Sequence, residues 1–374
     1  SMSVAMVSDR VHPSPVKPRD MAAADSRKLR REMIMIVTRV TIQTLMITES
    51  ITMKSVSAHL ASDRFVIAVR SLVAIAVFVL ASCGGGVATG PTAGSPSFDG
   101  AAALAHVETQ VAFGPRVPGS SGHAAQLSWM LDQLQPHASD VVADTFSHVT
   151  TGGDSLILTN VRARFAPQQS RRIVILAHWD TRPTSDQAAD SADHSIPVPG
   201  ANDGGSGTAV LLALAPLLAQ IAPPVGVDLL FVDGEDYGPG VEDMLLGARH
   251  YAETVSDEDR PIYGLLLDMV GDAQPSFPVE QISAQFANPI VQKVWRAAER
   301  LGYRDFFPTA VGESLTDDHV PLIENGIPTA NMIDFTYGPN NGYWHTPQDT
   351  PDKLSAATLD MVGQVVVELI YSGG

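Results

Sequence analysis

The 374-residue sequence contains a single cysteine, Cys83, and few basic residues. One cysteine excludes an internal disulfide framework and any cysteine-based zinc site. The 24 lysines and arginines are outnumbered by 41 aspartates and glutamates, which gives a formal net charge of −17. This balance argues against a nucleic-acid or anionic-membrane surface, because both need a basic face. The longest apolar run, 71–82, is too short to span a bilayer as an ordinary helix.

The apolar run at 71–82 has the character of an export signal. Lys54, Arg64 and Arg70 precede it, and it ends in Leu-Ala-Ser-Cys at 80–83. A basic region, a short apolar region and small residues before a cleavage point are typical of secretory signals. The ending is similar to the lipoprotein box of bacteria, in which the cysteine becomes the lipidated N-terminus. A buried helix with a core cysteine is the alternative.

The sequence divides into four segments on this interpretation. Residues 1–52 have no role in export and are either an over-extended start or a genuine extra segment. Residues 53–83 are a lipoprotein signal peptide, and the Gly/Pro/Ser/Thr-rich stretch 84–96 is a flexible tether. Residues 97–374 are the folded domain. We expect an exported bacterial lipoprotein, held by a lipid on Cys83 at the periplasmic side or the cell surface.

Apolar runs alternate with helical patterns from residue 97 onward, without an internal repeat or a second linker. This alternation predicts one α/β domain with a twisted, mostly parallel central sheet flanked by helices. Strands are predicted at 156–164, 172–178, 227–233, 263–268 and 329–333. Helices are predicted at 123–134, 207–219, 243–253, 289–301 and 354–371, with a short one around 320–324.

Polar residues stand where several predicted strands end: Asn160 lies within the first strand, and His178, Asp233 and Asp268 close the next three. Ligands bind at the carboxyl ends of strands in open α/β sheets, so we expect these side chains on one rim. Asp180 follows His178 in a His-x-Asp pair, from which it can orient the imidazole. Taken alone, the pair also fits a solvated strand end.

Other acidic residues and a histidine stand in loops. Asp203 lies in a Gly-rich segment before a predicted helix, where it is either a ligand or a helix N-cap. Glu235 and Asp236 follow a strand, and adjacent carboxylates there either share a cation or form an ordinary acidic turn. His345 follows Trp344 in a Pro/Gly/Asn-rich loop, a context typical of surface histidines. Nitrogen and carboxylate ligands suit zinc with an open coordination position.

In this order and spacing, the motifs resemble the zinc-dependent aminopeptidase superfamily and, within it, the glutaminyl-peptide cyclotransferases of animals and bacteria. The resemblance covers roughly residues 97–372. The segment 113–120, Phe-Gly-Pro-Arg-Val-Pro-Gly-Ser, is similar to the early Gly-Pro-Arg-x-Pro-Gly motif of that family. His-Trp-Asp-Thr-Arg-Pro at 178–183 is similar to the bacterial branch. The implied fold is the zinc aminopeptidase-like, phosphorylase/hydrolase-like one.

The resemblance implies a role for each matching residue. Asp203, Asp236 and His345 match the ligands of a single zinc, and Glu235 matches the general acid/base. The remaining matches are two carboxylates that hydrogen-bond with that glutamate, Asp268 and Asp317, and a pocket wall, Trp344.

A second metal position is also implied, since His178 and Asp268 match ligands of the two-zinc aminopeptidases. Asp180 is then a further ligand or an orienting residue beside them. Many relatives have Glu-Glu where this chain has Glu235-Asp236, so one ligand is a methylene shorter. The disulfide of the animal cyclases is also absent.

The activity implied is conversion of an N-terminal glutamine of peptides or proteins to pyroglutamate with release of ammonia, by a monomer with one zinc. A two-zinc aminopeptidase is the alternative. Asp317-Asp318-His319 favours the cyclase, because aminopeptidases of this group more often show Ser-Asp-His there. A non-catalytic binding lipoprotein is the third class, and it is disfavoured because no expected ligand or base is replaced.

Overall fold

The computed structural model describes residues 96–374. The predicted signal peptide, the segment before it and all of the tether except Pro96 lie outside the described residues. Within the described range, no helix is both long and apolar enough to cross a membrane.

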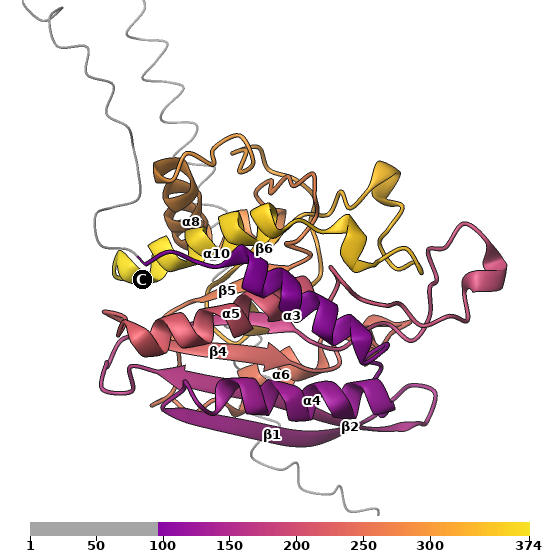
Figure 1. Ribbon diagram of the computed structural model, residues 1–374. Helices are drawn as coiled ribbons and strands as arrows, with labels where there is room; N and C mark the ends of the chain where they lie inside the picture. The colour runs from indigo at the N-terminus through magenta and orange to yellow at the C-terminus, as the bar shows by residue number, and fades with distance from the viewer. Residues whose placement is uncertain (1–95) are drawn as a thin grey trace, which may run out of the picture. The chain divides into compact units, whose positions relative to one another are not determined.

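A six-stranded twisted sheet forms the centre of the described chain (Figure 1). The strands are β1 Asp140–Val149, β2 Ser155–Phe165, β3 Arg172–His178, β4 Gly226–Val232, β5 Gly264–Asp268 and β6 Thr329–Ile333. Their spatial order is β1-β2-β4-β3-β5-β6. The last four in this order run parallel, whereas β1 and β2 are antiparallel neighbours at one edge. The predicted α/β class with a mostly parallel sheet is confirmed.

Helices cover both faces of this sheet. They are α3 Gly100–Ala112, α4 Ser121–Leu134, α5 Ser206–Gln220, α6 Leu246–Thr254, α7 Gln281–Phe286, α8 Asn288–Arg300, α9 His319–Glu324 and α10 Ala356–Tyr371. Short 3-10 turns occur at η2 Ser191–Asp193, η3 Val241–Asp243, η4 Pro339–Asn341 and η5 Pro351–Lys353.

The two faces follow from the alternation of side chains along each strand. In β3, Ile173, Ile175 and Ala177 join the larger core with α3, α4, α5, α8 and α10. Val174 and Leu176 point to the other face and pack with residues of α6 and α9. Because β3 is covered on both faces, it is a continuous apolar run that ends at a polar residue.

The predicted strands and longer helices agree with the structure to within a few residues, with four corrections. The prediction lacked β1, α3 and α7. Helix α6 begins at Leu246 rather than at 243, because η3 and a left-handed Leu245 (φ 58°) separate it from the preceding acidic turn. Helix α10 begins at Ala356 rather than at 354, because η5 occupies 351–353.

The fourth correction concerns Asn160. Strand β2 runs antiparallel to β4, so its carboxyl end lies at the opposite edge of the sheet from those of β3, β4 and β5. Asn160 still reaches the rim from within β2, where its Oδ1 accepts a hydrogen bond from the amide of Asp233 at 3.1 Å.

Candidate active site

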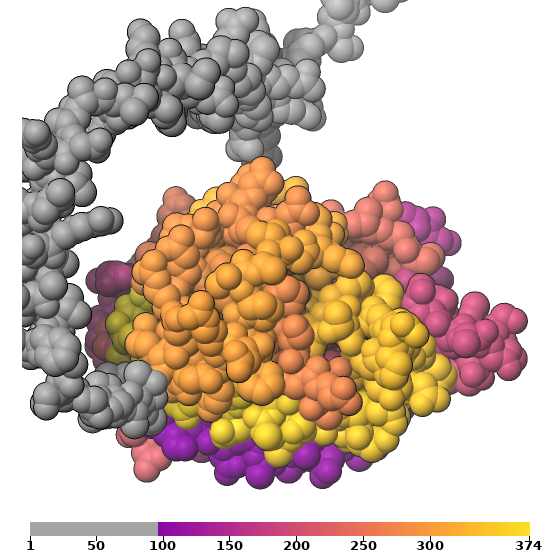
Figure 2. All heavy atoms as spheres, turned by 90° about the horizontal axis from the view of Figure 1, so that it is seen from above, coloured from indigo at the N-terminus to yellow at the C-terminus, as the bar shows by residue number. Residues whose placement is uncertain are grey.

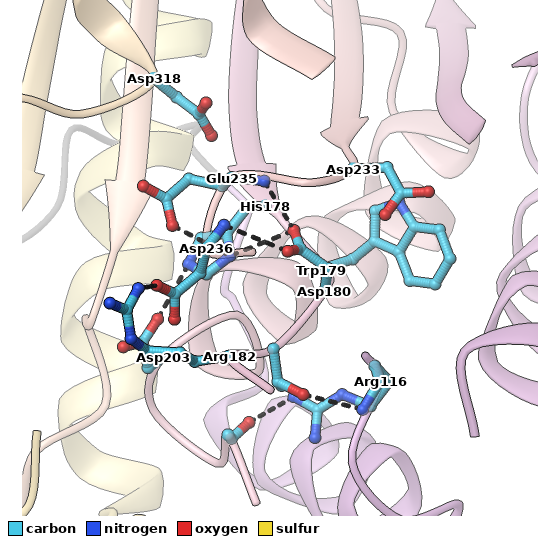
Figure 3. Close-up of polar contacts among 12 residues, drawn as sticks. Arg116, His178, Trp179, Asp180, Arg182, Asp203, Asp233, Glu235, Asp236 and Asp318 are labelled. Atoms are coloured by element: carbon cyan, nitrogen blue, oxygen red, sulfur yellow. Dashed lines mark hydrogen bonds and ion pairs between the residues drawn. The ribbon is translucent and has the colours of Figure 1, made fainter. Parts of the chain in front are cut away.

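The parallel strands bring the predicted residues to one rim. His178 ends β3, Glu235 and Asp236 follow β4, and Asp268 ends β5. Asp203 arrives from the glycine-rich loop before α5, and His345 from the segment after η4. Figure 3 shows His178, Asp203, Glu235 and Asp236 converging there.

Two groups of potential metal ligands form on this rim, and Asp203 belongs to both. Ligand atoms of Asp203, Asp236 and His345 all lie within 4.8 Å of one another, and those of His178, Asp203 and Asp268 do likewise. His345 Nε2 lies 3.4 Å from Asp203 Oδ2 and 3.4 Å from Asp236 Oδ1. His178 Nε2 lies 3.1 Å from Asp203 Oδ1 and 3.2 Å from Asp268 Oδ1. The sequence-predicted sets are therefore assembled as two neighbouring groups.

Asp180 supports this arrangement from behind. Its two carboxylate oxygens accept hydrogen bonds from the backbone amides of Glu235 at 3.0 Å and Asp236 at 3.1 Å. Asp180 Oδ1 also lies 3.6 Å from His178 Nδ1, on the opposite side of the ring from the carboxylates of the ligand group. Asp180 is thus placed to orient His178 and the turn after β4, as the His-x-Asp spacing predicted, rather than to join either ligand group.

Burial and crowding raise the pKa of Glu235 and Asp268, whereas at Asp203 the effect of burial is overcome by His178 and His345, which hold its pKa well below the usual value. Burial raises the pKa of Glu235 well above its usual value, and Asp236, Asp318 and Asp317 add to the rise, while His178 opposes it. Burial and the charge of Asp317 raise the pKa of Asp268 to about 7. A glutamate with a raised pKa is suited to act as a general acid/base.

The pKa values of the two imidazoles are raised as well, because the surrounding carboxylates stabilise their charged form. Burial alone would lower the pKa of His345, but the surrounding carboxylates, Asp236 first among them, raise it to about 12. His178 is fully buried too, and its carboxylate neighbours raise its pKa well above the ordinary value. The carboxylates therefore attract positive charge strongly at both imidazoles.

This donor set fits zinc. Each group combines one imidazole with two buried carboxylates, and nitrogen and oxygen donors are those that zinc takes in catalytic sites. A buried carboxylate cluster of this density is costly without a cation to balance it. In both groups the histidine Nε2 faces the carboxylates, so a bound cation would replace a proton at a position that the fold already prepares.

The loop that carries Asp203 is fixed by residues to which the sequence had assigned no role. Asp349 accepts hydrogen bonds from the amides of Asn202 at 2.8 Å and Asp203 at 3.2 Å, and from the Tyr337 hydroxyl at 2.8 Å. Arg116, fully buried, donates to the carbonyl oxygens of Pro199 and Gly200 (Figure 3). The Gly-Pro-Arg motif draws attention to Arg116 in the sequence, whereas no motif points to Asp349.

A pocket opens beside both ligand groups. Its acidic part contains Asp203, Glu235, Asp236, Asp268 and Asp317, and its apolar walls are Met244, Met269, Leu315, Ile333, Phe335 and Trp344. Trp344 stacks on His345 with ring centroids 3.9 Å apart. Trp344 thus lines the pocket, as the resemblance implied, and it also limits the movement of His345.

The two adjacent aspartates before α9 have different surroundings. Asp317 lines the pocket and accepts hydrogen bonds from Asn331 Nδ2 at 2.7 Å and from the amide of Asp318 at 2.6 Å. Asp318 is fully buried, and neither of its oxygens has a hydrogen-bond partner. Asp318 occupies the N-cap position of α9, but its side chain makes no capping bond to the helix.

The comparisons with known proteins agree with this site. The model of peptidase family M28 matches residues 160–370. The chain is 30% identical over 210 residues to aminopeptidase YwaD of Bacillus subtilis, a match that covers 53% of this chain but only 40% of that protein. It is 26% identical over 280 residues to a glutaminyl-peptide cyclotransferase of Drosophila melanogaster, covering 67% of this chain and 75% of that protein.

A solved structure extends the likeness to the whole fold. The crystal structure of Bacteroides thetaiotaomicron glutaminyl cyclase bound to N-acetylhistamine matches with a TM-score of 0.72 and 35% identity. The alignment covers 75% of this chain and 100% of that one. The resemblance found in the sequence is confirmed: this chain belongs to peptidase family M28, the family of zinc-dependent exopeptidases and their cyclase relatives.

Proposed function

We propose that this protein is a zinc-dependent glutaminyl-peptide cyclotransferase, which converts an N-terminal glutamine to pyroglutamate and releases ammonia. The observation that carries the proposal is the position of Asp317, which lines the same pocket as Glu235 and Asp268. Burial and nearby like charges raise the pKa values of Glu235 and Asp268, so these carboxyls can share protons within the pocket. Similarity to a glutaminyl cyclase over the full length of that chain supports the same conclusion.

The reaction closes a ring within one substrate molecule. The α-amine forms a bond to the δ-carbon of the glutamine side chain, which is the carbonyl carbon of its amide, and the bond from that carbon to the amide nitrogen breaks. Glu235 takes a proton from the attacking amine and returns one to the leaving ammonia. The apolar walls, Trp344 and Phe335 among them, hold the side chain folded and keep water away, so that proximity lowers much of the barrier.

Asp203, Asp236 and His345 would hold the zinc ion, which when bound acts as a Lewis acid and polarises the carbonyl of the side-chain amide. Asp268 and Asp317 are then the carboxyls that hydrogen-bond to Glu235 and to the amide nitrogen. Two carboxyls form a hydrogen bond with each other only when one of them is protonated. The raised pKa values of Glu235 and Asp268 favour that protonation.

One observation favours a second candidate, a two-zinc aminopeptidase. His178, Asp203 and Asp268 form a complete second group of potential ligands. Asp317 lines the same pocket as Asp268, and its charge raises the pKa of Asp268. This favours a proton shared between the two carboxyls over a second zinc ion bound to Asp268. We therefore propose one zinc per chain, and metal analysis of the purified protein tests the number directly.

Peptide and protein N-termini are the proposed substrates. Every residue assigned to the site comes from one chain, so we expect the monomer to be active. Incubation of the zinc-loaded protein with a glutamine-initiated peptide should yield free ammonia and a peptide lighter by one ammonia. Release of free glutamine, with the peptide shortened by one residue, would instead assign the aminopeptidase.

We also propose that the protein is an exported lipoprotein anchored through Cys83. The support is the basic and apolar sequence that ends in Leu-Ala-Ser-Cys at 80–83 and the tether-like composition of 84–96. Expressed in a bacterium with lipoprotein processing, the protein should incorporate a labelled fatty acid and fractionate with membranes. The Cys83→Ser variant should lose both properties. Equal labelling of the variant would contradict the proposal.

A further inference from the structure

Arg182 and Asp186 form a closed ring of contacts with two residues of the proposed zinc site. Arg182 Nη1 donates to Asp236 Oδ1 at 2.7 Å, a bond visible in Figure 3. Its Nε and Nη2 donate to the two oxygens of Asp186 at 2.9 and 3.0 Å. Asp186 Oδ1 lies 3.3 Å from His345 Nδ1, and His345 Nε2 lies 3.4 Å from Asp236 Oδ1, which closes the ring.

Asp186 lies beside the His345 nitrogen that faces away from the ligand group, with its Oδ1 3.3 Å from Nδ1. A histidine that ligates a metal through one nitrogen carries its proton on the other, and the partner of that proton fixes the ring's tautomer and orientation. Asp186 is the carboxylate beside Nδ1, so Nε2 is left to face Asp203 and Asp236. The backbone of His345 is left-handed (φ 53°), a conformation uncommon outside glycine. Its carbonyl also accepts a hydrogen bond from the amide of Gln187 at 3.2 Å.

Asp236 is held by the other end of the ring. An aspartate is one methylene shorter than the glutamate common at this position, so its carboxylate has less reach. The guanidinium of Arg182 is buried and makes a short, charge-assisted bond to it, which fixes one oxygen. Because the same guanidinium binds Asp186 through two parallel bonds, its position is itself defined.

The ring connects the metal site to a projecting loop. Arg182 and Asp186 begin the segment 182–198, whose η2 part stands out from the body of the domain in both Figure 1 and Figure 2. The amide of Val198 donates to the carbonyl of Arg182 at 3.0 Å, so the two ends of the segment meet at this residue. Both side chains thus belong to the loop and act on the site.

We propose that Arg182 and Asp186 are positioning residues of the metal site, which set its affinity for zinc by holding Asp236 and His345. Neither belongs to a ligand group, so each acts through the ligand that it contacts. The inference rests on the zinc assignment within the proposed function. It predicts that zinc affinity falls when either contact is lost, even where the domain stays folded.

The test is competition between a zinc chelator and the wild-type protein or its Asp186→Asn variant. We expect the variant to bind zinc about 10- to 100-fold more weakly, the effect typical of residues that orient metal ligands. The matched control is Asp193→Asn, which removes the same charge from a half-buried position on the same loop, outside both ligand groups. The control should bind zinc like the wild type, with the melting temperatures of all three proteins recorded.

Arg182→Lys provides the second variant, because lysine keeps the charge but cannot bridge Asp236 and Asp186 through a planar fork. It should also weaken zinc binding, and saturating zinc should restore most of kcat with KM little changed. If Asp186→Asn is folded and binds zinc within twofold of the wild type, the proposal is overturned. A wild-type protein that binds no zinc would also overturn it.

The readout separates this inference from the proposed reaction. If the variants lose zinc affinity as expected but the wild type cleaves peptides instead of cyclising glutamine, the positioning role stands and the cyclase assignment fails. If the wild type cyclises glutamine and zinc affinity is unchanged in the variants, the assignment stands and Arg182 and Asp186 serve only to hold their loop.

Discussion

Replacing Glu235 with glutamine separates proton transfer from zinc binding. The two side chains have nearly the same shape, and the backbone of Glu235 is held independently of its carboxyl. Its amide donates to Asp180 at 3.0 Å, and its carbonyl accepts from Leu245 at 2.9 Å. Glu235 belongs to neither ligand group. The variant should therefore keep the fold and the zinc, and lose only the group that moves the proton.

The size of the effect follows from the role assigned. A positioned general acid/base contributes about 10²- to 10⁴-fold to a rate. The loss corresponds to about 3–5 kcal/mol of transition-state free energy. Burial raises the pKa of Glu235, which means that the folded protein disfavours its charged form. A neutral glutamine removes that cost, so the melting temperature should stay equal or rise.

The assay is steady-state cyclisation of a glutamine-initiated peptide, with zinc content measured on the same samples. We expect kcat of Glu235→Gln to fall at least 100-fold, with KM and zinc content close to the wild type. Asp236→Asn is the matched comparison, because the same chemical change one residue later should deplete zinc instead. A kcat within tenfold of the wild type, or loss of zinc from Glu235→Gln, would refute the assignment.

Three further predictions concern the support of the site. Asp349→Ala leaves three buried donors without an acceptor and should lower the unfolding free energy by about 1–3 kcal/mol and weaken zinc binding; unchanged urea midpoints would contradict this. Gly207→Ala would place a Cβ 2.1 Å from the Leu267 carbonyl oxygen, so it should lower the unfolding free energy by about 1–3 kcal/mol. The control Gly152→Ala, whose Cβ would have its nearest atom at 3.6 Å, should leave the melting temperature unchanged. Burial and the charge of Asp203 raise the pKa of Asp349 to about 7. A carboxyl whose pKa is raised in the folded state contributes its full stability only below the pKa of the unfolded chain, about pH 4. The chelator-treated protein should therefore lose stability from pH 5 to pH 8, and higher urea midpoints at pH 8 would contradict this.

The parts of the fold that could be predicted were those with a strong local pattern. Strand β3 is an uninterrupted apolar run because it is buried on both faces, and its predicted bounds are those observed. Strand β1 lies at the edge of the sheet, and none of its residues is buried, so its sequence shows little alternation. Helix α7 has only six residues and is held by its capping residue Glu280 rather than by a long amphipathic pattern.

Strand ends and loops in the sequence supplied the candidate ligand residues, and the resemblance to a known family selected three of them as a set. The structure brings Asp203, Asp236 and His345 together, although 142 residues separate the first from the last. The residues that hold them could not be predicted in the same way. Asp349 lies 146 residues from the amide of Asp203 that it binds, and an isolated aspartate gives no sign of such a contact. Pairings of this kind depend on the folded topology.

The most direct test uses two peptides that differ only in their first residue, glutamine or leucine, mixed in one reaction with the zinc-loaded protein. Mass spectrometry then follows both peptides over the same time course. The proposed function predicts that the glutamine peptide becomes lighter by one ammonia while the leucine peptide stays intact. Removal of the leucine, with the glutamine peptide not cyclised, would contradict it and assign the protein to the aminopeptidases of its family.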